Sequence, residues 1–516
     1  MFTKRTLSVM LAVLLFLGFL VLPAFVGGSN GPVLTILHTN DLHGRFQASD
    51  AAIGHDFISS VFDRLKAERN GAVLLLDAGD TVRGIYYVGQ SRGESAIDIM
   101  NAAGYDAMTV GNHDFDYGWE RLKDLAVMSD FPFLLSDTIS DKAPGFAPYA
   151  IYERGNLKVG VFGLTTPETV FRSSGGFDKD FGDAGSLISY AQETTNELRA
   201  AGADIVICLA HLGTYATAYG SSFDVRDKVT GIDLIIDGHS HGSLSAIKQV
   251  DGKAAVVTAD AYGSTLGLVE IYKDGAAYKI SAESLFKEDF GDVKPNAKVA
   301  ETIDIWAEAV RVDGTSVVAQ IPFEIAVIRA EENTRETVMG KIAADAFIAA
   351  SDADIAITHG GGTRAQVLSA GNVTKAQLVG IFPSGNYLKM ARVSGSVILE
   401  ALEHGVALYP EPSSAFPHVS GLTFTFDPLK PPGSRVSDVM VGDAPLDRCK
   451  RYILVANDFI ATGGEGFDML VEPFRKPLPL EGNGIFALED ALIWYFENYH
   501  SSFSKEFDVR ITVSSG

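Results

Sequence analysis

The chain has 516 residues, too many for one ordinary hydrophobic core, so we expect two domains and a connection between them. Hydrophobic residues make up 47% and charged residues 21% of the sequence, which excludes an intrinsically disordered protein. Asp and Glu outnumber Lys and Arg by 65 to 42, and the resulting net charge of -23 excludes a general binder of nucleic acid or of anionic membranes.

The N-terminus has the pattern of an export signal. Lys4 and Arg5 precede an apolar run from about Leu7 to Leu22, and small residues follow it. We therefore predict that residues 1–28 form a signal peptide. An uncleaved membrane anchor is the alternative, because the apolar run is long for a signal. In both cases the rest of the protein is expected to be secreted, periplasmic or at the cell surface, and cleavage would leave no stable membrane insertion.

Short apolar runs rich in β-branched residues recur through the first half of the chain, and most of them end in a polar cluster. Runs of this kind indicate strands that are buried on both faces. The expected strands are Val33–Leu37, Val73–Leu76, Ala107–Val110, Lys158–Phe162, Ile205–Leu209 and Leu234–Ile236. Helical stretches such as 58–68 and 186–200 lie between them. This alternation predicts a layered α/β domain, in which ligands bind at the carboxyl ends of the strands.

The pattern changes after Lys287. The segment Pro295–Val312 reads as one helix, which we interpret as the connection between two halves. Mixed helices and strands are expected beyond it. Cys208 lies in an apolar run and is expected to be buried, and nothing in the sequence places it beside Cys449, so a disulfide between them is not indicated.

The polar clusters that follow the first-half strands carry side chains that bind metals. These are carboxylates, one amide and imidazoles: Asp41, His43, Asp80, Asn112, His211, His239 and His241. This donor set suits divalent ions such as Zn, Mn, Fe or Co. A single Asp at a strand end is commonly a helix cap, but the joint occurrence points to a metal centre. In an extended segment, residues two apart share a face, so Asp41 with His43, and His239 with His241, are each expected to point to one side.

These clusters resemble the signature blocks of calcineurin-like metallophosphoesterases. Their form closely resembles that of the bacterial periplasmic UDP-sugar hydrolase/5'-nucleotidase family and of animal ecto-5'-nucleotidases. The matching blocks are His38–Gly44, Asp77–Asp80, Gly111–Asp116 and Gly238–His241 in the first half, and Thr358–Arg364, Phe416–Leu422 and Asn457–Phe467 in the second. The resemblance covers nearly all of the chain after the signal.

The resemblance implies an α/β fold with two domains. An N-terminal four-layer α/β sandwich would span 31–292, a linker that includes a helix would span 293–325, and a C-terminal α/β substrate-binding domain would span 326–516. It also implies two divalent metal ions, with zinc or manganese expected. Asp41, His43, Asp80 and His241 would hold one ion. Asp80, Asn112, His211 and His239 would hold the other, with Asp80 bridging the two.

Roles for further residues also follow from the resemblance. His113 would stabilise the transition state, and Asp116 would orient the His113 side chain. The expected substrate-binding residues are Arg329, Arg335, Arg364, Asn386 and Phe467. An arginine after a three-glycine turn suits phosphate binding.

Two positions depart from the family pattern. Ser384 stands where an aromatic ring commonly stacks on the base, and His359 stands where the family has asparagine. Phe382 and Tyr387 lie near Ser384 in the sequence. Loss of a stacking partner would remove about 1–3 kcal/mol of binding per base.

The implied function is hydrolysis of nucleotides to nucleoside and phosphate, with UDP-sugar hydrolysis or 2',3'-cyclic phosphodiesterase activity as further options. Two alternatives stay open: a dimetal hydrolase of a non-nucleotide phospho- or sulfo-ester-like substrate, and a non-catalytic surface-binding protein. The expected partner is a small nucleotide and not nucleic acid. Sequence does not determine the oligomeric state.

Overall fold

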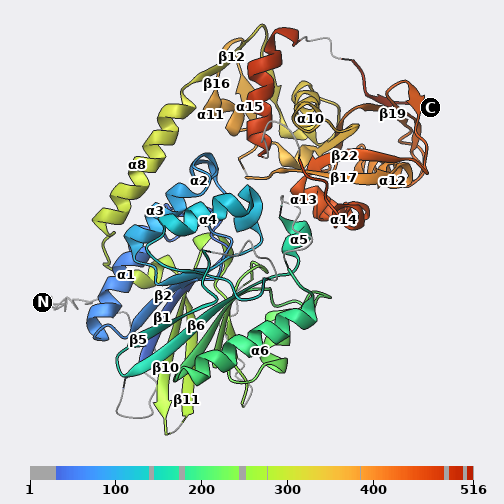
Figure 1. Ribbon diagram of the computed structural model, residues 1–516. Helices are drawn as coiled ribbons and strands as arrows, with labels where there is room; N and C mark the ends of the chain where they lie inside the picture. Colours follow the sequence, from blue (N-terminus) through green and yellow to red (C-terminus); the bar gives the residue numbers. More distant parts are fainter. Residues whose placement is uncertain are drawn as a thin grey trace, which may run out of the picture.

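The computed structural model describes residues 31–138, 145–173, 181–242, 252–275, 277–383, 385–480, 487–503 and 508–514. The predicted signal peptide and Ser384 lie outside the described residues. The chain forms two lobes joined along one side by a long helix, α8 (Figure 1). None of the helices in the described ranges combines the length and the apolar character that spanning a bilayer requires.

The first sheet of the N-terminal lobe contains the first three of the six strands expected in this half of the chain. Its order is β11-β10-β1-β2-β3-β4 across the described residues. The strands are β1 (Leu34–Thr39), β2 (Val73–Asp77), β3 (Ala107–Thr109), β4 (Phe133–Leu134), β10 (Leu266–Asp274) and β11 (Ala277–Leu285). β1 to β4 run parallel to one another, whereas the hairpin β10–β11 adds an antiparallel edge that the sequence analysis did not predict.

The second sheet has the order β5-β6-β7-β8-β9. Its strands are β5 (Tyr149–Arg154), β6 (Leu157–Thr165), β7 (Ile205–His211), β8 (Leu234–Asp237) and β9 (Ala255–Val257). β6 to β9 are parallel. Every residue of β7 and β8 is buried, as their uninterrupted apolar sequences predict.

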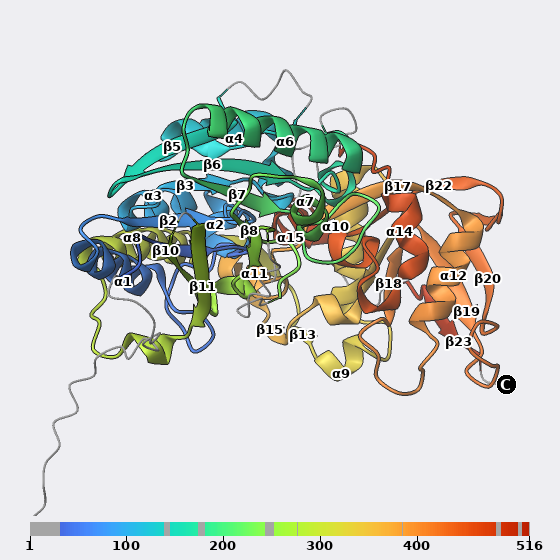
Figure 2. The same ribbon diagram turned by 90° about the horizontal axis from the view of Figure 1, so that it is seen from below.

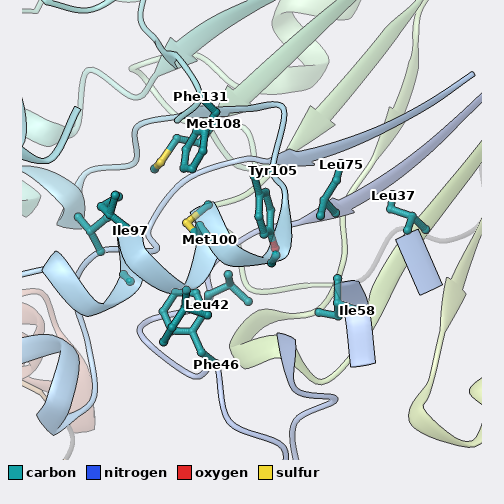
Figure 3. Close-up of a cluster of buried hydrophobic side chains, with 14 of the residues drawn as sticks. Leu37, Leu42, Phe46, Ile58, Leu75, Ile97, Met100, Tyr105, Met108 and Phe131 are labelled. Carbon is teal, nitrogen blue, oxygen red and sulfur yellow. The ribbon is translucent and has the colours of Figure 1, made fainter. Parts of the chain in front are cut away.

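Four layers result from the packing of helices on the outer faces of these two sheets. The sheets meet through a core that includes Leu74 and Ile207. On the outside of the first sheet pack α1 (His55–Glu68), α3 (Glu94–Ala103) and α4 (Gly118–Met128). Figure 3 shows part of this outer core, in which Leu37 and Leu75 of the sheet lie near Ile58 of α1 and Met100 of α3. On the outside of the second sheet pack α6 (Ala184–Ala200) and α7 (Ser222–Lys228), and Figure 2 shows α6 above β6.

Helix α1 shows why these segments become helices on the sheet. Its buried residues include Ile58, Val61, Phe62 and Leu65, which recur at the three- and four-residue spacing of one helical face. The N-terminal lobe is thus the four-layer α/β sandwich expected from the sequence. Cys208 is buried in β7, Cys449 is exposed, and both are free thiols.

The connecting helix α8 (Ala297–Gly314) lies within two residues of its predicted bounds. Asn296 caps it, because its side-chain oxygen accepts hydrogen bonds from the backbone N–H groups of Lys298 and Val299. The helix packs against α1 and α3 of the N-terminal lobe and reaches α11 of the C-terminal lobe.

The C-terminal lobe is built on a mixed sheet of order β17-β22-β14-β18. Helices α10 and α15 pack on one face through a core that includes Phe347 and Phe496, and α12 and α14 pack on the other through Ile398 and Leu470. A second sheet has the order β21-β20-β19-β23, and two small pairs are β12-β16 and β13-β15. The main elements are β12 (Val317–Ile321), β13 (Ile325–Val327), α10 (Val338–Ser351), β14 (Ile355–His359), β15 (Gln366–Leu368), β16 (Gly371–Thr374), α11 (Lys375–Val379), β17 (Leu388–Ser394), α12 (Gly395–Gly405), β18 (Pro417–Ser420), β19 (Leu422–Phe426), β20 (Val436–Val441), β21 (Ala444–Pro445), β22 (Arg451–Asn457), α14 (Asp468–Phe474), α15 (Leu488–Tyr499) and β23 (Ile511–Val513).

Short helical turns complete both lobes. They are α2 (Tyr86–Gln90), η1 (His113–Tyr117), α5 (Thr169–Arg172), η2 (Ala261–Gly263), η3 (Lys287–Phe290), α9 (Arg329–Glu332), η4 (Gly360–Gly362), α13 (Asp458–Ala461), η5 (Gly464–Gly466) and η6 (His500–Ser502). Of these, α5 and α13 lie where the two lobes approach each other (Figure 1).

Candidate metal centre and adjoining cavity

The predicted metal donors follow strands of both N-terminal sheets. β1, β2 and β3 are parallel neighbours in the first sheet, and β7 and β8 are parallel neighbours in the second. Their carboxyl ends therefore meet at one edge of the sandwich. The folded chain brings the predicted donors of both sheets to this edge.

The donors form two groups. The ligand atoms of Asp41, His43 and His241 lie within 4.8 Å of one another, and so do those of Asp80, His211 and His239. Oδ2 of Asp80 lies 3.1 Å from Nε2 of His211 and 3.9 Å from Nε2 of His43. Asp80 therefore faces one residue of each group, which is the placement a bridging carboxylate needs.

The backbone at the donors is not extended, contrary to the expectation for the two residue pairs. Asp41 and His43 have φ of 49° and 44°, and His239 and His241 have φ of 73° and 52°. Asp80 has φ of 57°. Non-glycine residues rarely adopt this left-handed region, and each costs on the order of 1 kcal/mol or more. The donors converge because of these turns, not because of the alternation of a strand.

The hydrogen bonds of the imidazoles leave their ligand atoms free. Nδ1 of His211 donates to the carbonyl oxygen of Ala78 at 2.7 Å, which leaves its Nε2 facing Asp80. Nε2 of His239 lies 3.2 Å from Oε2 of Glu168, which leaves its Nδ1 for a metal. A second partner that fixes a ligating histidine in this way is typical of metal sites.

Asn112 gives an independent test of the fit. Both its Oδ1 and its Nδ2 are buried and have no hydrogen-bond partner within the described part of the chain. Buried amides are nearly always satisfied, so this orphaned side chain needs a ligand. Nε2 of His43 and Nε2 of His241 also face each other at 3.2 Å. Together with the carboxylates, these groups fit two divalent ions.

The electrostatics at this edge favour ionised carboxylates and a neutral His43. His211 differs, because burial lowers its pKa but the carboxylates of Asp80 and Asp41 outweigh burial and raise it to about 10, so metal binding would displace the His211 proton. Burial raises the pKa of Asp41, but the bond to His241 and the charge of His211 outweigh it, so the net shift is downward. Burial also raises the pKa of Asp80, but the charges of His211 and His113 outweigh it and hold the pKa well below its ordinary value. Burial lowers the pKa of His43 to about 3. Deprotonated carboxylates and imidazoles are the forms that bind metals.

Asp114 organises the loop that carries Asp80, a role the sequence analysis missed. Its carboxylate accepts backbone N–H bonds from Asp80, Thr81 and Val82 at 2.9, 2.8 and 2.9 Å, and from Gly111 at 2.8 Å. It is fully buried, and burial raises its pKa to about 6. Its place beside His113 in the Gly111–Asp116 block was the available signal.

His113 lies beside the donors but is held differently. Its backbone N–H donates to Oδ1 of Asp80 at 2.7 Å, and its Nδ1 lies 3.0 Å from Oδ2 of Asp116. Burial lowers the pKa of His113, but the carboxylates of Asp80 and Asp116 outweigh it and raise the pKa overall. The ring is thus oriented through Nδ1, and its Nε2 is available to a ligand in the adjoining cavity.

This cavity, of about 350 Å³, lies between the lobes. Its N-terminal wall includes His43, His113 and His241, so it opens directly on the metal donors. Its C-terminal wall comprises Gly385, Asn386, Tyr387, Asp458, Phe459 and Thr462. Of the predicted substrate residues, Asn386 is therefore brought to the metal centre. Its Nδ2 donates to Oδ1 of Asp458 at 2.8 Å.

The predicted arginines lie elsewhere on the C-terminal lobe and are not among the residues that line this cavity. Nη1 of Arg329 and Nη1 of Arg364 donate to the same carbonyl, that of Thr363, at 2.9 and 3.0 Å. Burial and the neighbouring Arg329 lower the pKa of Arg364. Arg335 is largely exposed and pairs with Glu331 at 2.6 Å.

Phe467 is also placed away from the cavity. Its ring is fully buried in the C-terminal core and meets His404 edge-on at 4.9 Å between ring centres. It offers no free face for stacking in this structure, because the left-handed turn at Gly466 directs the chain into the core. Of the two aromatic residues near Ser384 in the sequence, Phe382 is buried as well, and Tyr387 reaches the cavity.

An aromatic residue that the sequence analysis passed over does line the cavity. Phe459 is 44% exposed and packs face-on against His359 at 5.8 Å and 30°. Tyr262, at 40% exposed, lines the opposite side, 5.2 Å from the His241 ring. Phe459 lies inside the Asn457–Phe467 block, so its position in that block was the available signal.

Comparisons with known proteins agree with this architecture. Residues 34–243 match the model of the calcineurin-like phosphoesterase family, and residues 314–472 match that of the 5'-nucleotidase C-terminal domain. The 5'-nucleotidase of Diplobatis ommata is 30% identical over 505 residues, which cover 87% of this chain and 86% of that protein.

Two further matches extend the comparison. The 5'-nucleotidase precursor of Thermus thermophilus superimposes with a TM-score of 0.58 at 30% identity, over 94% of this chain and 99% of that one. The trifunctional nucleotide phosphoesterase protein YfkN of Bacillus subtilis is 30% identical over 85% of this chain, but the match spans only 32% of that longer protein. The chain belongs to the 5'-nucleotidase family of calcineurin-like phosphoesterases, whose members are phosphoric ester hydrolases.

Proposed function

We propose that this protein is a 5'-nucleotidase that hydrolyses nucleoside monophosphates to nucleoside and phosphate with a two-metal centre. The observation that carries the proposal is the cavity between the lobes. One wall of this cavity is formed by metal-type donors and His113, and the other by a polar and aromatic surface of the C-terminal lobe. A phosphate would lie at the first wall and the rest of the substrate at the second.

The residues that would hold the ions are those brought together at the strand ends. Asp41, His43 and His241 would hold one ion, and Asn112, His211 and His239 the other, with Asp80 between them. We propose zinc or manganese, since carboxylate, amide and imidazole donors suit both. When bound, a pair of divalent ions polarises the phosphoryl oxygens and lowers the pKa of water.

His113 would act on the substrate itself. Asp116 holds Nδ1, so an Nε2–H group can donate to the phosphoryl or the leaving oxygen as negative charge develops there. Because Asp80 and Asp116 raise the pKa of His113, its protonated form is favoured. This side chain would therefore stabilise charge and supply a proton to the departing alcohol.

The C-terminal wall supports a nucleotide as the substrate. Phe459 offers a ring face of the kind on which bases stack, and Asn386 and Asp458 offer hydrogen-bonding groups. The Arg329–Arg364 pair, together with the exposed Arg335 of the same lobe, supplies local positive charge on an otherwise acidic protein. We propose that these arginines attract the anionic substrate to this lobe.

A substrate panel tests the proposal. Purified, metal-loaded protein is assayed with AMP, UDP-glucose, 2',3'-cyclic AMP and a simple aryl phosphate. We expect AMP to be hydrolysed with the highest kcat/KM, and the other two nucleotides show whether UDP-sugar or cyclic phosphodiesterase activity accompanies it. If the aryl phosphate is hydrolysed and all three nucleotides are not, the nucleotidase proposal is wrong.

A non-nucleotide phosphate or sulfate-like ester is the second candidate substrate. The observation that favours it is the burial of Phe467, which removes one expected stacking ring from the cavity wall. Turnover of the aryl ester alone in the same panel would support this candidate.

Location and domain limits are also proposed. The charged and apolar N-terminal segment supports export, and thus a secreted, periplasmic or cell-surface enzyme. We propose domains at 31–292 and 326–516 with 293–325 as the linker. The hydrophobic cores support a division within 293–325, since one set of cores draws on residues up to Ile303 and the other begins at Ala319.

A further inference from the structure

Arg83 lies at the contact between the two lobes and has no role in the mechanism above. It follows the Asp80 loop and is 6% exposed. Its Nε lies 3.2 Å from Oδ2 of Asp116 in the N-terminal lobe. Its Nη1 donates to the carbonyl oxygen of Gly385 in the C-terminal lobe, and its guanidinium lies 4.9 Å from the centre of the Tyr387 ring.

The atom that Arg83 contacts on Asp116 is the one that orients His113. Oδ2 of Asp116 lies 3.0 Å from Nδ1 of His113 and 3.2 Å from Nε of Arg83. Asp116 is 4% exposed, so water competes little for this carboxylate. Without the guanidinium, the carboxylate would lose a charged partner and could rotate away from the imidazole.

The C-terminal lobe in turn fixes Arg83. Gly385 has φ of 70°, and a Cβ there would come within 2.7 Å of the carbonyl oxygen of Gly84 and 3.4 Å of Nη1 of Arg83. Only a glycine lets the backbone approach this closely. The Tyr387 ring covers Arg83 and lies 6.0 Å from the His113 ring. Both lobes therefore determine where the guanidinium lies.

We propose that Arg83 is a positioning residue for phosphate ester hydrolysis, which fixes Asp116 and through it His113 while the backbone of Gly385 holds its other end. This inference rests on the proposed function, because it assumes that His113 acts on the substrate. The contact between Gly385 and Arg83 then has a catalytic consequence, because through it the C-terminal lobe helps to orient His113 of the N-terminal lobe.

Two other roles for Arg83 make different predictions. If Arg83 only bound substrate, its removal would raise KM and leave kcat unchanged. If it only held the lobes together, its effect would add to that of removing the Asp116 charge. A residue that acts through Asp116 should lower kcat, and should have no further effect once Asp116 has lost its function.

The test is a double-mutant cycle with Arg83→Met and Asp116→Asn. We expect Arg83→Met to lower kcat at least about tenfold with KM changed less than about threefold, and the double variant to match Asp116→Asn within about twofold. Arg83→Lys keeps the charge but cannot contact both Asp116 and the carbonyl of Gly385, so we expect its kcat to lie between those of wild type and Arg83→Met. The Lys variant replaces the Met variant in the cycle if the Met variant does not fold. Arg154→Met is the matched control, because the guanidinium of Arg154 also pairs with a carboxylate, that of Asp106 at 2.5 Å, and lies 5.2 Å from the Tyr152 ring. Arg154 stands on β5 and is not among the residues that line the cavity of His113.

A second readout does not depend on turnover. In zinc-loaded protein labelled with ¹⁵N-histidine, the ring signals of His113 are assigned by their loss in His113→Gln. We expect these signals to shift or broaden in Arg83→Met and to be unchanged in Arg154→Met. An additive double variant, a change confined to KM, or an unaltered His113 signal would overturn the inference. Wild-type protein that hydrolyses no phosphate ester would instead refute the proposed function, and the ring signals would still decide whether Arg83 positions His113.

Discussion

Nδ1 of His113 lies 3.0 Å from Oδ2 of Asp116, so the carboxylate holds the imidazole in one orientation. We assign this pair to contact with the substrate and not to metal binding. The pair sits on the short helical turn η1, directly after the strand β3, so its geometry follows from local structure. Because Asp116 engages Nδ1, the Nε2 side of the ring faces the cavity.

His113→Ala should lower kcat by about 100- to 10,000-fold, the range typical of general acid–base groups. Metal content should stay at its wild-type value, because the imidazole of His113 is not among the grouped donors. The measurement is steady-state kinetics with metal analysis by mass spectrometry. His500→Ala, on the distant turn η6, is the control. Retained turnover would remove His113 from the mechanism.

Asp80→Asn should reduce both activity and metal content. Oδ2 of Asp80 faces His211 at 3.1 Å and His43 at 3.9 Å, so a loss of charge here weakens both groups of donors. Metal analysis after dialysis is expected to give fewer than two ions per chain. Asp50→Asn, an exposed change in the same lobe, should bind as many metal ions per chain as the wild type. Two ions retained by Asp80→Asn would contradict the bridging role.

Glu168→Gln tests whether this carboxylate supports a metal ligand. Oε2 of Glu168 lies 3.2 Å from Nε2 of His239 and also pairs with Arg172. Burial raises the pKa of Glu168, but His239 and Arg172 outweigh it and lower the pKa to about 2. Loss of such a partner weakens metal binding about 10- to 100-fold. Titration of the variant with a competing chelator measures this change. An unaltered metal affinity would mean that Glu168 only forms an ion pair with Arg172 and does not support His239 as a ligand.

Phe459→Ala and Phe467→Ala should have different consequences. Phe459 is 44% exposed on the cavity wall, whereas Phe467 is fully buried. Phe459→Ala should raise KM for AMP by about 5- to 150-fold with little change in Tm, since stacking contributes about 1–3 kcal/mol per base. Phe467→Ala should lower stability by about 3–5 kcal/mol, as aromatic core truncations do. Steady-state kinetics and thermal unfolding distinguish the two variants. A rise in KM seen only in Phe467→Ala would show that Phe467, not Phe459, stacks on the base.

Glu489 gives a pH-dependent prediction. It lies at the start of α15, is 4% exposed, and its Oε2 has no hydrogen-bond partner among the described residues. Burial, with Asp490, raises its pKa from an ordinary 4.5 to about 8. Its contribution to stability is therefore fully present below pH 4.5 and is lost as the pH rises through 8.

Glu489→Gln should remove this loss, because glutamine carries no charge at any pH. The Tm of the variant relative to wild type should rise between about pH 5 and pH 9, by an amount corresponding to roughly a few kcal/mol at most. Glu497→Gln, an exposed change on the same helix, should show no such trend. A constant difference between wild type and Glu489→Gln across this range would contradict the prediction.

The residues of the metal centre could be predicted from sequence because each lies at the last residue of a buried strand or in the turn that follows one. Apolar runs such as β7 and β8 leave few alternatives to central strands, and parallel neighbours bring their carboxyl ends together. The connecting helix α8 was predictable for a similar local reason, since a capped helical segment stands between two different patterns.

Other features depend on tertiary structure. The sequence could not show that Asp41, His43, Asp80, His239 and His241 adopt left-handed backbone conformations, because turn geometry is imposed by the packed loops around them. It also could not distinguish Phe459 from Phe467, which lies further along the same block. Only the packing of the C-terminal core buries one ring and leaves the other at the cavity.

The sequence by itself thus determined the fold class and the donors of the metal centre, because both follow from the periodicity of burial and from chemistry at strand ends. Only the tertiary structure determined the cavity and the partners of Arg83. Its contact with Asp116 joins two loops of the N-terminal lobe, and its contact with Gly385 joins the two lobes, so both depend on how distant parts of the chain pack together.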